Sequence, residues 1–148
     1  MRMRNIPALA ATAVFSLAAS CDGELDEVNA VRRIINSSSV EAQVVIRNGI
    51  DTVNFVLASG DTTEFNGFCT YDERRFCNLG WEGNSESEVR FVTDSGVLVW
   101  RHDFSGDFPD AARGIGANPQ FEKYGYEGET VNDVIIYTFR ILDSDIPR

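Results

Sequence analysis

The stretch Val40-Glu-Ala-Gln-Val-Val-Ile-Arg-Asn-Gly-Ile-Asp-Thr-Val-Asn-Phe-Val-Leu57 decides the fold class of this chain. Apolar and polar residues alternate on both sides of Asn48-Gly49, as in a strand with one buried face. Asn-Gly suits a two-residue type I′ turn, because both central residues need positive φ. A turn centred on these two residues pairs Val44 with Val53 and gathers apolar side chains on one face. The stretch therefore predicts a β-hairpin.

A second hairpin is expected from Glu88–Thr93 and Val97–His102, which flank Asp94-Ser95-Gly96. A two-residue Ser-Gly turn would place Arg90 opposite Arg101, which is repulsive. A three-residue loop with a left-handed Gly96 instead pairs Arg90 with Trp100 and Glu88 with His102. We therefore expect the three-residue loop.

A closing strand is expected over Asn132–Leu142, because alternate residues from Ile135 to Ile141 are apolar. Phe121–Tyr126 is expected to pair with it across a turn at Glu127–Thr130. Residues 31–36 and 63–68 are further strand candidates. About seven short strands separated by turns predict an all-β fold, a small antiparallel β-sandwich.

The first 20 residues are typical of an export signal. Arg2 and Arg4 provide a positive start, and the 14 residues Ile6–Ala19 are largely apolar. A helix of that length reaches about 21 Å, whereas the hydrocarbon core of a bilayer is about 30 Å thick. The segment therefore predicts a signal peptide over residues 1–20 rather than a membrane-spanning helix.

The signal ends in Leu17-Ala-Ala-Ser-Cys21, which resembles a lipobox, the site where lipoprotein signal peptidase cuts before a lipid-modified cysteine. Ala18 departs from that pattern, since leucine is commonest at this position. Ordinary signal peptidase could cut the same bond and leave a free thiol, and an uncleaved anchor is a further alternative. The resemblance implies that Cys21 carries the lipid and holds the protein on a membrane.

Cysteine usage agrees with lipidation at Cys21. The chain has three cysteines, and an odd thiol in an exported protein calls for an explanation. Lipid on Cys21 leaves Cys69 and Cys77 as an even pair in an oxidising compartment. We expect a structural disulfide rather than a metal or redox site, because the spacing is not C-x-x-C and no histidine lies nearby.

Charge excludes two classes of partner. Loss of residues 1–20 removes two arginines and takes the net charge from −10 to −12. Nucleic-acid binding requires clustered Lys and Arg, and anionic lipid head groups would repel such a domain. We expect a polar acidic tether over residues 21–30 and the β-sandwich domain over residues 31–148, with covalent lipid as the membrane contact.

The chain resembles small uncharacterised lipoproteins of Bacteroidota-type bacteria. The resemblance is carried by the Asn-Gly hairpin, by Val89-Arg-Phe-Val-Thr-Asp-Ser-Gly-Val-Leu-Val-Trp100, and by Ile136-Tyr-Thr-Phe-Arg-Ile-Leu-Asp-Ser-Asp145. It implies a small β-sandwich and no known activity. The acidic run after Cys21 resembles a surface-export signal of such bacteria, which implies the outer membrane, on its periplasmic or its surface-exposed side. Under the enterobacterial sorting rule, Asp22 would instead imply inner-membrane retention.

Few residues are candidates for chemistry. His102 is the only histidine, and Glu88 or Asp103 could orient it as a general base. Asp103, Asp107 and Asp110 could ligate Ca²⁺, but their spacing is not that of a calcium loop. We therefore expect no catalytic site, no metal and no cofactor.

Binding is expected near the segment Asp103–Gln120, which has the composition of a long loop. The candidate binding residues are Trp100, His102, Asp103, Asp107 and Asp110. Trp81, Trp100, Tyr124 and Tyr126 could stack on a sugar, although core packing is their commoner role. Gly114-Ile-Gly116 lacks the strand–helix context of a phosphate loop.

The function expected from the sequence is a lipid-anchored envelope protein that binds a protein, glycan or small ligand and is not an enzyme. An accessory subunit of an envelope complex is the first alternative, and it predicts an unpaired sheet edge for strand addition. A hydrolytic enzyme is the second, and it requires a pocket that brings His102 or paired carboxylates together.

Overall fold

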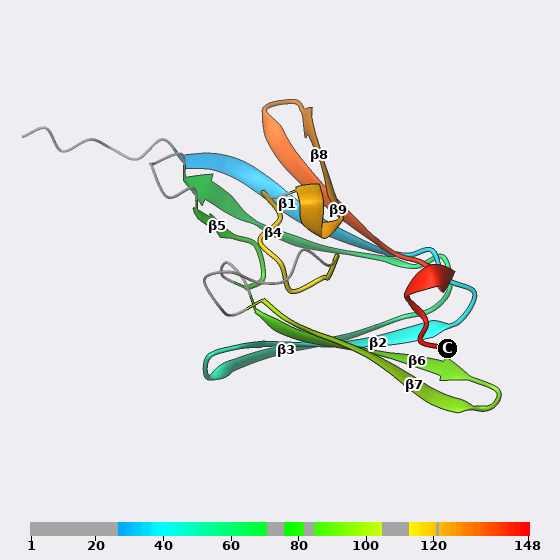
Figure 1. Ribbon diagram of the computed structural model, residues 1–148. Helices are drawn as coiled ribbons and strands as arrows, with labels where there is room; N and C mark the ends of the chain where they lie inside the picture. The colour runs from blue at the N-terminus through cyan, green and yellow to red at the C-terminus, as the bar shows by residue number, and fades with distance from the viewer. Residues whose placement is uncertain (1–26, 71–75, 82–84, 105–112, 121) are drawn as a thin grey trace, which may run out of the picture.

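The computed structural model describes residues 27–70, 76–81, 85–104, 113–120 and 122–148. Within these ranges, nine strands form two sheets that face each other, which confirms the all-β sandwich (Figure 1). Cys21, the residues 1–20 expected to form a signal peptide, Asp107 and Asp110 lie outside the described residues.

The larger sheet has five strands in the order β5-β4-β1-β9-β8, and β1 and β9 are parallel while the other neighbours are antiparallel. The strand β1 begins at Glu27, so the last four residues expected in the tether belong to the domain. The strands are β1 (Glu27–Asn36), β4 (Thr62–Thr70), β5 (Phe76–Asn78), β8 (Tyr126–Val131) and β9 (Val134–Ile141).

The smaller sheet has four antiparallel strands in the order β3-β2-β6-β7. The hairpin expected at residues 40–57 is confirmed, but its expected register was wrong by two residues. The turn residues are Gly49-Ile50, with φ of 61° at Gly49, so Val44 faces Phe55. A shift of two keeps each side chain on its face. The strands are β2 (Glu41–Asn48), β3 (Asp51–Leu57), β6 (Glu86–Thr93) and β7 (Gly96–Asp103).

The three-residue loop expected between β6 and β7 is wrong. Thr93 pairs with Gly96, so Asp94-Ser95 is a two-residue turn. This register places Glu88 opposite Arg101 and Val89 opposite Trp100. It therefore joins opposite charges on the outer face and turns Trp100 toward the other sheet, as cross-strand pairing favours.

The turn expected at Glu127–Thr130 is also wrong, because these residues belong to β8. The turn between β8 and β9 is Asn132-Asp133, with φ of 51° and 63°. Asn and Asp tolerate the left-handed conformation better than other side chains, so this pair forms the type I′ geometry that Asn-Gly was expected to form.

The core lies between the sheets and includes Ile34, Val44, Phe91 and Phe139, all almost fully buried. Asn36 stands where the chain leaves the larger sheet for the smaller one. Its side-chain amide donates hydrogen bonds to the carbonyls of Val40 (2.8 Å) and Leu57 (2.9 Å). These bonds satisfy buried backbone acceptors at the crossing.

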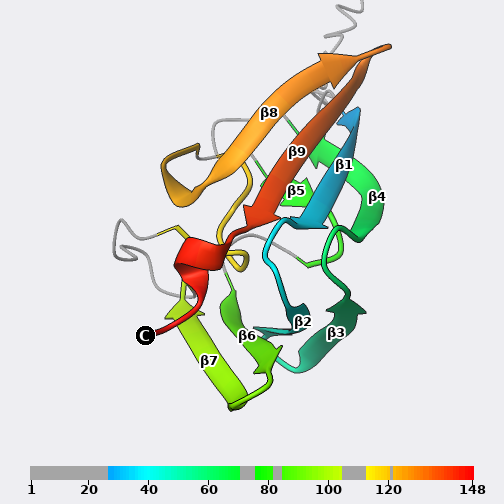
Figure 2. The ribbon, with the colours of Figure 1, turned by 90° about the vertical axis from the view of Figure 1, so that its right-hand side faces the viewer.

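Two short 3₁₀ turns complete the described chain, η1 (Glu122–Tyr124) and η2 (Asp143–Asp145). Figure 2 shows η2 at the end of β9, where the chain turns toward β7. Asp143 accepts hydrogen bonds from the backbone N–H and hydroxyl of Ser39, which lower the pKa of its carboxyl group. Within the described ranges, no helix is long and apolar enough to cross a membrane.

Candidate functional site

Two surface pockets share the side chain of Arg113. The first, here the Trp100 pocket, has a volume of about 440 Å³ and is lined by Trp100, His102, Arg113, Ser144, Asp145, Ile146, Pro147 and Arg148. The second, here the Tyr126 pocket, has a volume of about 510 Å³ and is lined by Arg113, Glu122, Gly125, Tyr126, Glu127, Gly128 and Leu142. Arg113 therefore supplies a positive charge to both pockets.

Arg113 is held by several partners. One guanidinium nitrogen donates to the carboxylate of Asp145, and another donates to the carbonyl of Arg140 at 2.6 Å. The guanidinium carbon also lies 4.7 Å from the ring centroid of Phe139. Charge-assisted hydrogen bonds and ring contacts together fix an arginine in one orientation. A ligand would therefore meet a preorganised cation.

Two glycines keep the segment after Arg113 close to the smaller sheet. A Cβ at Gly114 would lie 2.3 Å from the ring of Phe104, and one at Gly116 would lie 2.4 Å from the carbonyl oxygen of Ser85. The Ser85 N–H also donates to the Gly116 carbonyl at 2.7 Å. These glycines permit close packing, so their role in the described structure is positional.

Trp100 and His102 project from β7 into the Trp100 pocket, and both are half-buried. Their rings meet edge to face with centroids 4.8 Å apart, and Trp100 stacks on Phe139 at 6.4 Å. Burial lowers the pKa of His102, and Arg113 lowers it further while Asp145 opposes the shift. His102 is therefore mostly neutral at pH 7. Its buried Nε2 makes no hydrogen bond in the described structure.

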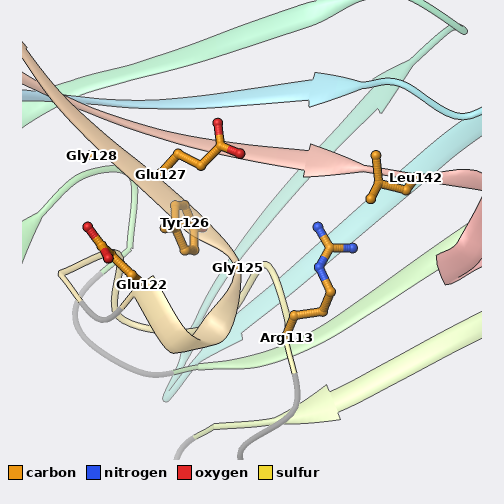
Figure 3. A pocket seen from close by; sticks show the side chains of 7 residues that line it. All are labelled: Arg113, Glu122, Gly125, Tyr126, Glu127, Gly128 and Leu142. Carbon is orange, nitrogen blue, oxygen red and sulfur yellow. The ribbon is translucent and has the colours of Figure 1, made fainter.

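The Tyr126 pocket has a rigid floor and acidic sides. The hydroxyl of Tyr126 donates to the carbonyl of Ile115 at 2.7 Å, and burial raises the pKa of this tyrosine to about 12. Figure 3 shows Arg113 extending toward Leu142, with Glu122 on the opposite side of the pocket. Arg113 is already neutralised by Asp145, and Glu122 and Glu127 add negative charge to the lining. The Tyr126 pocket therefore has little net attraction for an anion.

The candidate residues from the sequence are only partly brought together. Trp100 and His102 share a pocket, whereas Asp103 is exposed at the end of β7 opposite Glu86. Asp107 and Asp110, two of the three carboxylates of the calcium alternative, lie outside the described residues. No group of three or more metal-ligating side chains occurs among the residues described.

The disulfide expected between Cys69 and Cys77 is present. It joins neighbouring positions of β4 and β5, whose Cα atoms lie 4.1 Å apart, and both cysteines are buried. It therefore holds a three-residue edge strand to the sheet.

Sequence reasoning missed Arg113, whose flanking Ala-Ala and Gly-Ile-Gly residues carry no charge pattern. The close glycine spacing at residues 114 and 116 was the one available signal that this segment packs tightly. Comparison with known protein families, with curated proteins and with solved structures gives no match to this chain. The two pockets are therefore the features of the described structure that bear on function. A half-buried indole beside an ion pair suits noncovalent binding of a polar ligand that also has an apolar face.

Proposed function

We propose that this chain is a lipid-anchored cell-envelope protein that binds a glycan or similar polar ligand in the Trp100 pocket. The observation that carries the proposal is the half-buried Trp100 beside the Arg113–Asp145 ion pair. Sugars bind proteins through stacking on aromatic rings and hydrogen bonds to charged groups, and this pocket offers both.

The anchor is supported by the sequence at residues 17–21 and by the cysteine arithmetic. With Cys69 and Cys77 joined in a disulfide, Cys21 is the remaining thiol of the chain. Lipidation removes that thiol and provides membrane attachment for a domain whose charge opposes electrostatic binding to anionic lipid. The outer membrane is the proposed location, following the acidic residues after Cys21.

Binding rather than hydrolysis is supported by the surroundings of His102. Its ring neighbours are Trp100 and Phe104, and its Nε2 makes no hydrogen bond in the described chain. A general base needs an oriented partner and a polar route to the substrate. Asp145, the carboxylate whose charge acts on His102, is already bound to Arg113 and to the N–H of Leu142, and it makes no hydrogen bond to that Nε2.

A glycan array with the mature protein tests the binding proposal. Wild-type protein is expected to retain a restricted set of envelope saccharides, and Trp100→Ala is expected to weaken that binding at least about tenfold because the stacking surface is lost. Val99→Ala is the matched control, since Val99 precedes Trp100 on the same strand and points to the opposite face. Absence of any retained saccharide, or equal binding by Trp100→Ala, would contradict the proposal.

Mass spectrometry of the mature N-terminus tests the anchor. We expect a chain that begins at Cys21 and carries acyl groups, and a Cys21→Ala variant that is no longer membrane-bound. An unmodified Cys21 on a released protein would overturn the lipid anchor without touching the pocket.

The accessory-subunit alternative is favoured by one observation. Val97 and Val99 on the edge strand β7, with Val92 beside them on β6, are 37% to 56% exposed on the outer face. Strand addition along β7 would pair with the edge, and a partner that also extends over the outer face would cover these valines. Val97→Lys should abolish a co-purifying partner under this alternative and should leave glycan binding unchanged under the first proposal.

A further inference from the structure

Arg32 is buried in the centre of the sandwich. It lies on β1, the middle strand of the larger sheet, between Phe65 on β4 and Tyr137 on β9. Alternation along β1 places it on the inner face between Ala30 and Ile34, and its exposed fraction is 0%. Its neighbours are therefore core side chains rather than solvent.

The guanidinium of Arg32 has no hydrogen-bond partner within the described residues. All three of its nitrogens are buried without an acceptor, and so is the indole nitrogen of Trp81. The guanidinium carbon lies 3.8 Å from the ring centroid of Trp81 and 5.6 Å from that of Tyr126. Ring stacking covers a face of the guanidinium, while its N–H groups point outward within its own plane.

Arg32 keeps its charge in this position. Burial lowers its pKa to about 10, and Tyr126 opposes that shift. Tyr126 is the titratable side chain whose ring faces Arg32, and burial raises its pKa to about 12, so it is neutral at pH 7. A buried cation is expensive unless paired, and ring stacking offsets only part of that cost.

Arg33, the next residue on β1, has the carboxylate partners that Arg32 lacks in the described structure. Arg33 points to the outer face, where Glu64 contacts it at 2.7 Å and Glu129 at 3.6 Å. Arg32, on the inner face, has neither carboxylate. The donors of an arginine match two coplanar oxygens, as in a carboxylate.

We propose that Arg32 is the binding group of an internal site for a small carboxylate, which reaches it beside Trp81. Trp81 also lines a surface pocket of about 440 Å³, together with Asn78, Gly80, Val53 and residues 48–51. One indole therefore contacts both the pocket and the guanidinium. The carboxylate oxygens accept in-plane hydrogen bonds from Arg32, and the indole nitrogen of Trp81 supplies a further donor. This site is separate from the Trp100 pocket and does not depend on the proposed function.

Calorimetric titration of the mature protein with acetate tests the site, with chloride replaced at constant ionic strength. Wild type and Arg33→Met are expected to bind acetate with dissociation constants within about twofold of each other, because a surface pair contributes little. Arg32→Met is expected to lose measurable binding. If Arg32→Met fails to fold, Arg32→Lys keeps the charge but not the planar fork and should bind at least about tenfold more weakly.

Thermal unfolding gives a second readout. At an acetate concentration a hundred times the dissociation constant, the midpoint of wild type and of Arg33→Met should rise by about 10 °C. No heat and no stabilisation in wild type would overturn the proposal and assign the guanidinium to buried water. Equal acetate binding by Arg32→Lys would overturn the role of Arg32. Tighter binding of sulfate than of acetate would overturn the assignment to a planar carboxylate.

Discussion

The two sheets each bury one charged side chain among the described residues, and they surround it in opposite ways. Glu88 lies on the outer face of the smaller sheet, where Arg90 and Arg101 donate to its two oxygens at 2.5 Å and 2.7 Å. Arg32 lies between the sheets and stacks on Trp81 without an acceptor in the described chain. On the outer face, an arginine two residues along the strand and another on the neighbouring strand can neutralise a carboxylate. In the core, the apolar and aromatic side chains around Arg32 supply no counter-charge.

The largest expected effect comes from removing the ring that covers Arg32. Trp81→Ala should lower the free energy of unfolding by about 3–5 kcal/mol, because it opens a cavity and removes the stacking on the guanidinium. Denaturant unfolding measures this loss, with Trp100→Ala as the comparison. Trp100→Ala should lower the free energy of unfolding by less, because Trp100 is half-buried. Equal losses would contradict the special position of Trp81.

Removing the disulfide should have the next largest effect on the free energy of unfolding. Because the disulfide lies in the larger sheet, the loss should be confined to that sheet. The edge strand β5 has three residues and is tied to β4 by Cys69–Cys77. The double variant Cys69→Ala/Cys77→Ala should lose about 2.5 kcal/mol of unfolding free energy. The amides of β7 that pair with β6 should keep their hydrogen-exchange protection in this variant. Loss of protection in both sheets would contradict a local role for the disulfide.

Glu88→Gln should lower the free energy of unfolding by about 1 kcal/mol, because the charge of Arg90 and Arg101 is no longer balanced but both remain hydrated. The site is on an outer face, where solvent screens the pair.

Acid should affect wild type and Glu88→Gln differently. Burial raises the pKa of Glu88, but hydrogen bonds from Arg90 and Arg101 outweigh burial, so the pKa lies below its ordinary value of 4.5. The stability from this carboxylate is fully present above pH 4.5 and is lost as the pH falls through the lower folded pKa. Unfolding curves at a series of pH values should therefore converge for the two proteins in acid. A constant difference at all pH values would contradict this pairing.

The smallest expected effect is that of Arg33→Met, the outward neighbour of Arg32. Its ion pairs with Glu64 and Glu129 are partly exposed, and exposed pairs contribute roughly 0.2–1 kcal/mol. Chemical denaturation should show a loss at the lower end of that range. A loss as large as that of Trp81→Ala would remove the contrast between inner and outer arginines.

Alternation in the sequence predicted the strands of the two hairpins and β9, and which faces of β2, β3 and β9 are buried. It did not predict β8, because Tyr126–Val131 has no apolar alternation and was expected to be mostly turn. It could not determine the register of the first hairpin, because a shift of two residues leaves every side chain on the same face. In the second hairpin the error was one residue, so the expected pairing of Arg90 with Trp100 placed that ring on the wrong face. The opposite charges of Glu88 and Arg101 were the signal that would have decided it.

The candidate site was less predictable than the fold. Trp100 and His102 were expected to contribute to binding and do share a pocket, but Arg113 reaches them from a segment with no strand pattern. Arg32 follows the inward alternation of Ala30 and Ile34, so its position could have been predicted from period two alone. The missing hydrogen-bond acceptor around its guanidinium could not be predicted, because the residues around Arg32 come from the other sheet and from Trp81. No pattern along β1 describes these distant neighbours.

Nuclear magnetic resonance of the arginine Nε–Hε groups tests the contrast between the two buried charges most directly. During an acetate titration of the protein, the Arg32 signal should move and saturate, while those of Arg33, Arg90 and Arg101 stay in place because carboxylates already bind them. An Arg32 signal that does not respond to acetate would show that its guanidinium needs no external anion and would contradict the account.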